Sequence, residues 1–331
     1  MKTEKIINNL KELKGSYLVK TPDFKLLGAN SYGSLTYQFK NREDTSFGTA
    51  SVGKVFTAVA ILQLVEKGMI SLEQTIGELL PIDWNKIDST FTVKQLLTHQ
   101  SKLPDYFDEF VMEEYADLWK EIPNYSIRSG EDLLPLFIEK EMSDNEGFSY
   151  NNSGYVVLGI IVERVTKTTL EEYMKKHVFG VSGMKNTGYY ELDRLPFNSA
   201  TAYVKENENY YSNIYSIDAK GSGAGGVFTT AEDLEKFWES LFNYQLISKE
   251  MVDQMMTSHS VINEIISYGY GVWLRNEDGI HVPYIQGSDP GISAISWYHP
   301  SKKAMITLLS NYEDDVWEMS RDIKEILKEN N

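Results

Sequence analysis

The sequence predicts an α/β fold, in which one antiparallel sheet draws its strands from both ends of the chain, helices flank it, and a mostly helical domain is inserted in the middle. Two observations support this fold class. Short extended runs occur near the N-terminus and again in the C-terminal third, and stretches with helical spacing separate them. We expect residues 1–75 and 205–331 to form a discontinuous α/β domain, and residues 76–204 to form the helical domain.

The N-terminal elements are predicted to be a helix and two strands. Apolar residues recur at helical spacing from Thr3 to Leu13, which indicates an amphipathic helix. Two extended runs follow, Ser16–Lys20 and Lys25–Gly28, and the Pro-Asp pair between them is a turn signal.

Helical patterns dominate the centre of the chain. The pattern from Val52 to Gly68 predicts a long helix and places Ser51 at its entrance. A shorter helix is expected at Thr92–His99. The run Tyr155–Val165 fits a buried strand or a buried helix, and its length favours the helix. Residues 103–149 are typical of helices and loops.

The C-terminal third is rich in β-forming residues. A turn from His299 to Lys303 joins the last two predicted strands as a hairpin. A terminal helix is expected from Asp314 to Leu327. The predicted strands are Tyr268–Leu274, Tyr284–Gly287, Ile292–Tyr298 and Ala304–Ser310.

The composition excludes several classes of function. The formal net charge is −16, so the chain repels phosphate backbones and we expect no nucleic-acid partner. The chain has no cysteine, which excludes disulfides, thiolate nucleophiles and cysteine-ligated zinc. The five histidines lack the spacing of metal ligands, so we expect no metal and no cofactor.

The N-terminal segment is charged throughout and lacks the apolar core of a signal peptide. No stretch approaches the roughly 18 apolar residues of a membrane span. The chain as given is therefore expected in the cytoplasm, or outside the cell if an export signal has been removed from it. The sequence specifies no oligomeric state.

A serine and a lysine three residues apart, Ser51 and Lys54, mark the start of the first long helix. At this spacing both side chains share one helix face. A serine hydroxyl is a poor nucleophile until a base takes its proton, and a lysine can serve if its pKa falls toward neutrality. The helix start also offers free backbone N–H groups for an oxyanion. The motif alone is weak, because Ser182 and Lys185 repeat it.

A second motif, Tyr150-Asn151-Asn152, adds a phenol and an amide. A phenol beside a lysine can share or relay a proton, and an Asn amide can hold both the lysine and a substrate carbonyl. This motif is also weak alone, because Tyr211–Asn213 repeats its pattern and an Asn before a helix is often only a cap.

Five blocks of the sequence, in order, resemble the serine β-lactamase-like family, which groups class C β-lactamases, low-molecular-weight penicillin-binding proteins, D-alanyl-D-alanine carboxypeptidases and related esterases. The blocks run from about Gly33 to about Asn311. Ser51 with Lys54, and Tyr150 with Asn152, lie in matching surroundings, whereas the repeated motifs do not. The blocks are FGTASVGKVFTAVAILQLVEKGMISLEQTIGELLP, LLTHQSKLPDY, YNNSGYVVLGIIVERVTKTTLEEYMKKHVFGVSGMKNTGY, GSGAGGVFTTAEDLEKF and IQGSDPGISAISWYHPSKKAMITLLSN.

The resemblance implies a β-lactamase-like α/β sandwich with its active site in the groove between the two domains. It implies that Ser51 is the nucleophile, that Lys54 and Tyr150 handle its proton, and that Asn152 binds substrate. The backbone N–H groups of Ser51 and Ser288 are then expected to form the oxyanion hole.

The sequence departs from the family on the strand that lines the site. The family usually has Lys or His, a variable residue and Gly, whereas this chain has Ile285-Gln286-Gly287. The missing cation is the one that helps hold a substrate carboxylate, so recognition of penicillin or D-Ala-D-Ala is put in doubt. Gly287 still allows close approach of the strand, and we expect Gln286, Gly287 and Ser288 to contact substrate.

Several other residues that could belong to a site are interpreted as structural. His99 is expected to make a structural hydrogen bond, and His281 to lie at the surface. The glycines between Gly221 and Gly226 are typical of a tight turn rather than a phosphate loop. The aromatic residues of Tyr106–Tyr125 fit either core packing or the lining of an apolar substrate cleft.

Three functions fit these observations. The first is a serine hydrolase that acts through a covalent acyl-enzyme on a small ester or amide or a short peptide. The alternative is a D-alanyl-D-alanine carboxypeptidase, penicillin-binding protein or β-lactamase, and the third is a non-catalytic binding protein of the same fold. The intact set of Ser51, Lys54, Tyr150 and Asn152 argues against the third.

Overall fold

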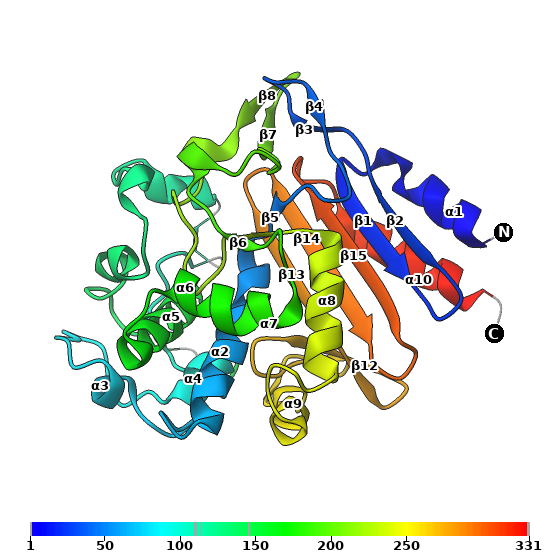
Figure 1. Cartoon of the computed structure of the whole chain (residues 1–331). Helices are drawn as coiled ribbons and strands as arrows, with labels where there is room; N and C mark the ends of the chain where they lie inside the picture. The colour runs from blue at the N-terminus through cyan, green and yellow to red at the C-terminus, as the bar shows by residue number, and fades with distance from the viewer. Residues whose placement is uncertain (1, 109–110, 113, 145, 330–331) are drawn as a thin grey trace.

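Eight strands form one antiparallel sheet that joins the two ends of the chain. The computed structural model describes residues 2–108, 111–112, 114–144 and 146–329. The strand order is β10-β11-β12-β13-β14-β15-β1-β2, so the N-terminal hairpin lies beside the last strand (Figure 1). These strands are β1 (Gly15–Lys20), β2 (Lys25–Ala29), β10 (Ser260–Val261), β11 (Ile266–Tyr268), β12 (Trp273–Glu277), β13 (Ile280–Asp289), β14 (Ile292–His299) and β15 (Ala304–Ser310). The predicted sheet built from both ends is confirmed.

Helices are spread along the whole chain, and three smaller antiparallel sheets occur among the described residues. The helices are α1 (Lys2–Asn9), α2 (Lys54–Glu66), α3 (Ile76–Leu79), α4 (Val93–Leu97), α5 (Asn152–Thr166), α6 (Leu170–Met174), α7 (Gly180–Ser182), α8 (Ala231–Phe242), α9 (Lys249–Met255) and α10 (Val316–Lys328). The small sheets pair β3 (Tyr32–Ser34) with β4 (Phe39–Lys40), β5 (Phe47–Gly48) and β6 (Gly188–Tyr189) with β9 (Val227–Thr229), and β7 (Tyr203–Glu206) with β8 (Asn209–Ser212).

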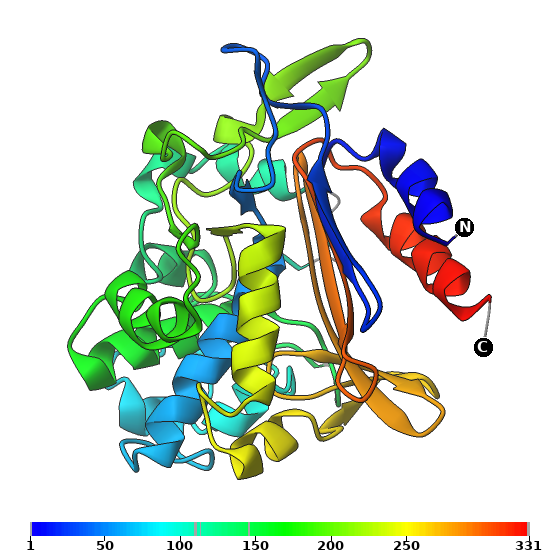
Figure 2. The same ribbon diagram turned by 45° about the vertical axis from the view of Figure 1, so that its right-hand side comes forward.

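The sheet is covered on both faces. Figure 2 shows it nearly edge on, with α1 and α10 on one side and α8, α2 and the remaining helices on the other. Ile6 of α1, Leu10 in the 3-10 turn that follows α1, and Ile323 of α10 are buried against sheet residues that include Ile306 and Leu308. The other face contributes to the larger core. This two-faced burial requires the apolar positions of β15 to be nearly continuous, which is typical of a central strand.

Helices α2 and α5 pack together at the centre of the larger core. The first 11 residues of each, from Lys54 and from Asn152, are buried on all sides. A helix that is apolar all round has no amphipathic stripe, which explains why the Tyr155–Val165 run also fitted a buried strand. The prediction of a helix there is confirmed.

Two element predictions need correction. The predicted strand Tyr268–Leu274 is wrong, because the chain reverses between Tyr268, which ends β11, and Trp273, which begins β12 and pairs with it. Gly271 makes this possible with a φ of 74°, a backbone region that favours glycine. The second correction concerns residues 103–149, where helices and loops are predicted. The described residues there form no α-helix, only loops and 3-10 turns at Tyr115–Trp119, Asn124–Ser126 and Glu131–Leu136.

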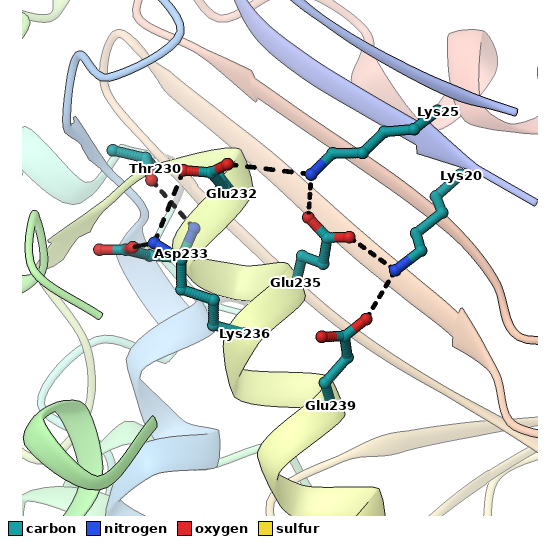
Figure 3. A network of polar contacts seen from close by, with 8 residues as sticks. All are labelled: Lys20, Lys25, Thr230, Glu232, Asp233, Glu235, Lys236 and Glu239. Atoms are coloured by element: carbon teal, nitrogen blue, oxygen red, sulfur yellow. Dashed lines mark hydrogen bonds and ion pairs between the residues drawn. The ribbon is translucent and has the colours of Figure 1, made fainter. Parts of the chain in front are cut away.

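An ion-pair network fastens α8 to the N-terminal hairpin (Figure 3). Glu235 accepts hydrogen bonds from the ammonium groups of Lys20 and Lys25, at 2.7 and 2.6 Å. Lys20 also donates to Glu239 at 2.6 Å. The pKa of Glu235 is lowered by its two lysine partners, which outweigh the opposing effect of burial. The network links an element near residue 20 to one near residue 235 across the sheet face.

Within the part of the chain that the structure describes, no helix is long and apolar enough to cross a membrane. The division into residues 1–75 with 205–331 and residues 76–204 stays a prediction. Strand β6, which belongs to the predicted helical domain, is hydrogen-bonded to β9, which belongs to the predicted α/β domain.

Candidate active site

Ser51 lies in a 3-10 turn, Ala50–Gly53, at the entrance of α2, so the helix begins two residues later than predicted. Strand β9 holds this turn, since the amide and hydroxyl of Thr49 both donate to the carbonyl of Val227, at 3.0 and 2.7 Å. Ala50 has a φ of 48°, which a residue with a Cβ adopts only where its surroundings impose it. The half-exposed Ser51 hydroxyl is therefore presented by a fixed backbone.

The glycine-rich turn 221–226 packs against the Ser51 turn. Ser222 and Gly225 exchange backbone hydrogen bonds, and the N–H of Gly226 donates to the carbonyl of Ala50 at 3.0 Å. A Cβ at Gly225 would lie 2.5 Å from that same carbonyl oxygen. The prediction of a tight turn is confirmed, and the close approach explains the need for glycine.

Lys54 is buried and directed at Ser51. Its ammonium donates to Ser51 Oγ at 2.9 Å, to Asn152 Oδ1 at 2.8 Å and to the carbonyl of Ala224 at 2.7 Å. The side chain is 2% exposed. These bonds fix the direction of the ammonium group, and a lysine held this way can exchange a proton with the serine hydroxyl.

Asn152 is the first residue of α5 and lies between Lys54 and a carboxylate that the sequence did not single out. Asp105 accepts hydrogen bonds from the backbone N–H groups of Asn152 and Ser153, at 2.8 and 3.1 Å, and from the Asn152 side-chain amide at 3.2 Å. Burial raises the pKa of Asp105 to about 6. The neighbouring Asn151 is the helix cap and accepts from the Gly154 N–H.

The Lys54 ammonium lies over the face of the Tyr150 ring, 4.9 Å from the centroid of that ring. It is packed between Trp273, at 5.9 Å in a stacked arrangement, and His99, at 4.5 Å. His99 Nδ1 accepts the Asn151 N–H at 3.0 Å, which confirms its predicted structural hydrogen bond. Burial, and after it the charge of Lys54, hold the pKa of His99 well below its usual 6.5. His281, in contrast, is exposed as predicted.

Strand β13 passes close to the Ser51 amide. A Cβ at Gly287 would lie 2.3 Å from the carbonyl of Thr49 and 2.7 Å from the Ser51 nitrogen, so only glycine allows this approach. Ile285, at the position of the family's cation, is 2% exposed and belongs to the core. Gln286 accepts a hydrogen bond from the indole of Trp317 at 3.0 Å.

Two cavities meet at Ser51 and Ser288. The first, of about 390 Å³, extends past Asn152 toward Tyr106, Tyr115 and Asp218. The second, of about 340 Å³, extends past Tyr150 toward aromatic residues and Gln286. Both volumes suit a small molecule. The Tyr106–Tyr125 segment thus contributes to a cleft as well as to packing.

The structure brings most of the predicted site residues together. Ser51, Lys54 and Asn152 are hydrogen-bonded in a chain, and the ring of Tyr150 covers Lys54. Ser182, Lys185 and the repeated Tyr211–Asn213 motif line neither cavity. Sequence reasoning missed Asp105 and Asp218, because a lone Asp after a proline or in a loop carries no signal of its own.

The comparisons with known proteins agree on one family. The family model described as Beta-lactamase matches residues 4–331. A penicillin-binding protein of Bacillus subtilis (strain 168) is 28% identical over 305 residues, which are 86% of this chain, and the match spans only 64% of that relative's length. A solved structure of a penicillin binding protein from Bacillus halodurans has a TM-score of 0.92 and 32% identity, and the match covers 98% of this chain and 99% of that one. A D-amino acid amidase from Ochrobactrum anthropi has a TM-score of 0.80 at 20% identity, with 100% and 99% covered, and shows likeness of fold.

Proposed function

Because the chain belongs to the beta-lactamase family, we propose that it is a serine acyl hydrolase that acts through a covalent acyl-enzyme on small amides or esters. The observation that carries this proposal is the 2.9 Å hydrogen bond between the buried Lys54 ammonium and the partly exposed Ser51 hydroxyl. A buried lysine aimed at a serine at the meeting point of two cavities suits nucleophilic catalysis better than structural support.

In the first step Ser51 Oγ attacks the substrate carbonyl carbon, and Lys54, in its neutral form, takes the hydroxyl proton with Tyr150 beside it. Asn152 Oδ1 and the carbonyl of Ala224 keep the Lys54 nitrogen in place during the transfer. The backbone N–H groups of Ser51 and Ser288 stabilise the developing oxyanion, each worth about 3 kcal/mol.

In the second step the bond to the leaving group breaks. Tyr150 donates its hydroxyl proton to the departing nitrogen or oxygen and takes in exchange the proton held by Lys54, so an amine or an alcohol is released and Ser51 carries the acyl group. Water then attacks the acyl-enzyme, which gives the carboxylic acid and restores the serine hydroxyl. Asn152, Gln286, Gly287 and Ser288 bind the substrate around the carbonyl, and no metal or other cofactor is needed for these steps.

The second candidate is a D-alanyl-D-alanine carboxypeptidase, penicillin-binding protein or β-lactamase, and the names of two similar proteins favour it. The side chain at the family's cation position weighs against it, because the buried Ile285 offers no charge to a substrate carboxylate. A non-catalytic binding protein is the third candidate. The cytoplasm remains the proposed compartment, and export would favour the second candidate.

The test is the mass of the intact protein after incubation with a fluorophosphonate and, separately, with a penicillin, in wild type and Ser51→Ala. We expect a fluorophosphonate adduct on wild type alone, and loss of turnover in Ser51→Ala without loss of folding. Retained turnover in Ser51→Ala would refute the assignment. A stable penicillin adduct, or hydrolysis of the drug in solution, would favour the second candidate. No adduct with either reagent and an intact drug would favour a binding protein.

A further inference from the structure

The proposed function assigns the two cavities beside Ser51 to different halves of a substrate. Tyr150 is the group that returns a proton to the leaving group, so the leaving group must lie next to it. Tyr150 lines the second cavity and does not line the first. The leaving group therefore occupies the second cavity, and the acyl group occupies the first, beyond Asn152.

The acyl cavity is acidic. Among the described residues that line it, four are carboxylates and none is basic; the carboxylates are Glu114, Asp218, Asp289 and Glu313. Among the described residues, Asp218, Glu114 and Glu313 take part in no ion pair with a lysine or arginine. Asp218 accepts a hydrogen bond from the Tyr115 hydroxyl at 3.1 Å, and burial raises the pKa of its carboxyl to about 6. A group of carboxylates at one cavity, three of them without a lysine or arginine partner, creates a negative potential that favours a bound cation.

The wall of the same cavity is aromatic. Tyr106, Phe107 and Tyr115 line it, with ring centroids of Phe107 and Tyr115 4.9 Å apart in an edge-to-face arrangement. Met112 adds a further apolar side chain. Such a wall suits an apolar side chain on the acyl group. Asp289 directly follows Ser288, whose N–H is the proposed oxyanion donor, and lines the same cavity, so the acidic part of the wall reaches the reacting carbonyl.

In the leaving-group cavity, none of the lining residues that the structure describes is charged. Its wall includes Phe148, Trp273, Trp317 and Gln286, together with Tyr150. An anionic leaving group, such as the free carboxylate of a terminal amino acid, finds no cation there, because the position that carries one in the family is the buried Ile285. A neutral leaving group matches this lining.

We propose that the substrates are amides or esters of amino acids with a free α-ammonium group and an apolar side chain, joined to an uncharged leaving group. This inference rests on the proposed serine hydrolase function and on the assignment of the two cavities. The ammonium binds among the carboxylates of the acyl cavity, and the side chain lies on its aromatic wall. Hydrolysis then adds water across the amide or ester bond and releases a free amino acid with a neutral amine, ammonia or alcohol.

The experiment compares three p-nitroanilides: D- or L-phenylalanine p-nitroanilide, its N-acetyl derivative, and 3-phenylpropionyl p-nitroanilide, which lacks the amino group. We expect kcat/KM for one enantiomer of the free-amine substrate to exceed that of both uncharged analogues by about 10-fold or more. Asp218→Asn is expected to reduce this ratio toward 1, and high salt to reduce it in the wild type.

Controls separate the inference from the proposed function. The double variant Glu114→Gln/Glu313→Gln changes two exposed positions and tests the cavity charge even if Asp218→Asn does not fold. Glu264→Gln, an exposed carboxylate outside the cavity, should leave the ratio at its wild-type value. A wild-type ratio near 1, or a ratio that no cavity variant changes, would overturn the inference about the substrate. If Ser51 is still labelled by the fluorophosphonate, the proposed hydrolase function stands. Absence of both labelling and hydrolysis would overturn both.

Discussion

His99 holds the backbone on both sides of Tyr150. Its carbonyl accepts the N–H of Ser149 at 2.9 Å, and its Nδ1 accepts the N–H of Asn151 at 3.0 Å. The ring also packs against the Tyr150 ring. An Nδ1 that accepts a hydrogen bond must carry no proton, so the neutral form of His99 with its proton on Nε2 is the one that fits the fold.

The lowered pKa of His99 predicts a pH-dependent stability. Below pH 6.5 the unfolded chain binds a proton at His99 that the folded protein does not bind. The free energy of unfolding therefore falls as the pH drops from 6.5 toward the folded pKa, by up to about 1.4 kcal/mol per pH unit. His99→Gln, whose amide oxygen can still accept the Asn151 N–H, should show a shallower pH slope in urea unfolding between pH 7.5 and 5.5. Parallel curves for wild type and His99→Gln would contradict the prediction.

At the scale of an element, the start of α5 depends on Asp105. Its two carboxylate oxygens accept from the first two N–H groups of the helix, which is where a helix favours negative charge. The same carboxylate accepts from the side chain of Asn152, whose Oδ1 binds Lys54. Asp105 is therefore a positioning residue that acts on the site through the helix start.

Replacement of Asp105 should affect turnover more than folding. In Asp105→Asn one carboxylate oxygen becomes an N–H donor that faces other donors, so Asn152 shifts and we expect kcat to fall about 10- to 100-fold. The matched control is Asp132→Asn, which changes an exposed carboxylate that also accepts two backbone N–H groups, of Arg128 and Ser129, away from the site. Equal kcat values for the two variants would show that Asp105 does not position the site.

Strand β13 supplies a second prediction at this scale. Gly287→Ala places a Cβ 2.7 Å from the Ser51 nitrogen, so the strand must move away and separate the two oxyanion donors. We expect kcat to fall about 100-fold or more, as for loss of one donor. Ser288→Ala keeps its backbone N–H and should retain kcat within about 5-fold, because the proposed role uses no side chain. Initial rates with a chromogenic ester test this, and a larger loss in Ser288→Ala than in Gly287→Ala would contradict it.

At the scale of the whole molecule, the sheet brings together elements from opposite ends of the sequence. Tyr17 of β1 lies opposite Leu308 of β15, and α1 packs beside α10. Glu235 adds a polar connection between α8 and the N-terminal hairpin, with 7% of its surface exposed. The hairpin is therefore held by the sheet on one side and by this network across the face (Figure 3).

The network predicts a measurable loss of stability. Glu235→Gln removes the buried charge that the two lysines share and leaves Lys20 paired with Glu239 and Lys25 with Glu232. We expect the free energy of unfolding in urea to fall by about 1–2 kcal/mol at pH 7. Glu239→Gln removes one exposed pair and should cost about 0–0.5 kcal/mol. Because the folded pKa of Glu235 is lowered, its contribution is present above its ordinary pKa and is lost as the pH falls through the folded value. Similar losses in both variants at pH 7 would contradict this account.

The sequence by itself determined the family and the main elements, and it predicted the residues that are proposed to react. The match over residues 4–331 confirms the family resemblance, and β15 spans the predicted Ala304–Ser310. Local signals suffice there, because a strand next to a Lys-Lys turn, or a helix after a capping Thr such as Thr92, is specified by neighbours within a few residues.

Only the tertiary structure decided how the site is assembled and what charge it presents. Lys54 binds Asn152, 98 residues away, and Ala224, 170 residues away, and no local pattern encodes such distances. The roles of Asp105 and Asp218 depend on burial beside groups from other loops, so each is an ordinary acidic residue in the sequence. The same holds for the strand predicted at Tyr268–Leu274, where the chain reverses at Gly271, so close to α2 that an added Cβ would lie 2.4 Å from that of Ala58. Long-range packing sets these features, since burial and charge pairing are properties of the folded surroundings and not of the residue.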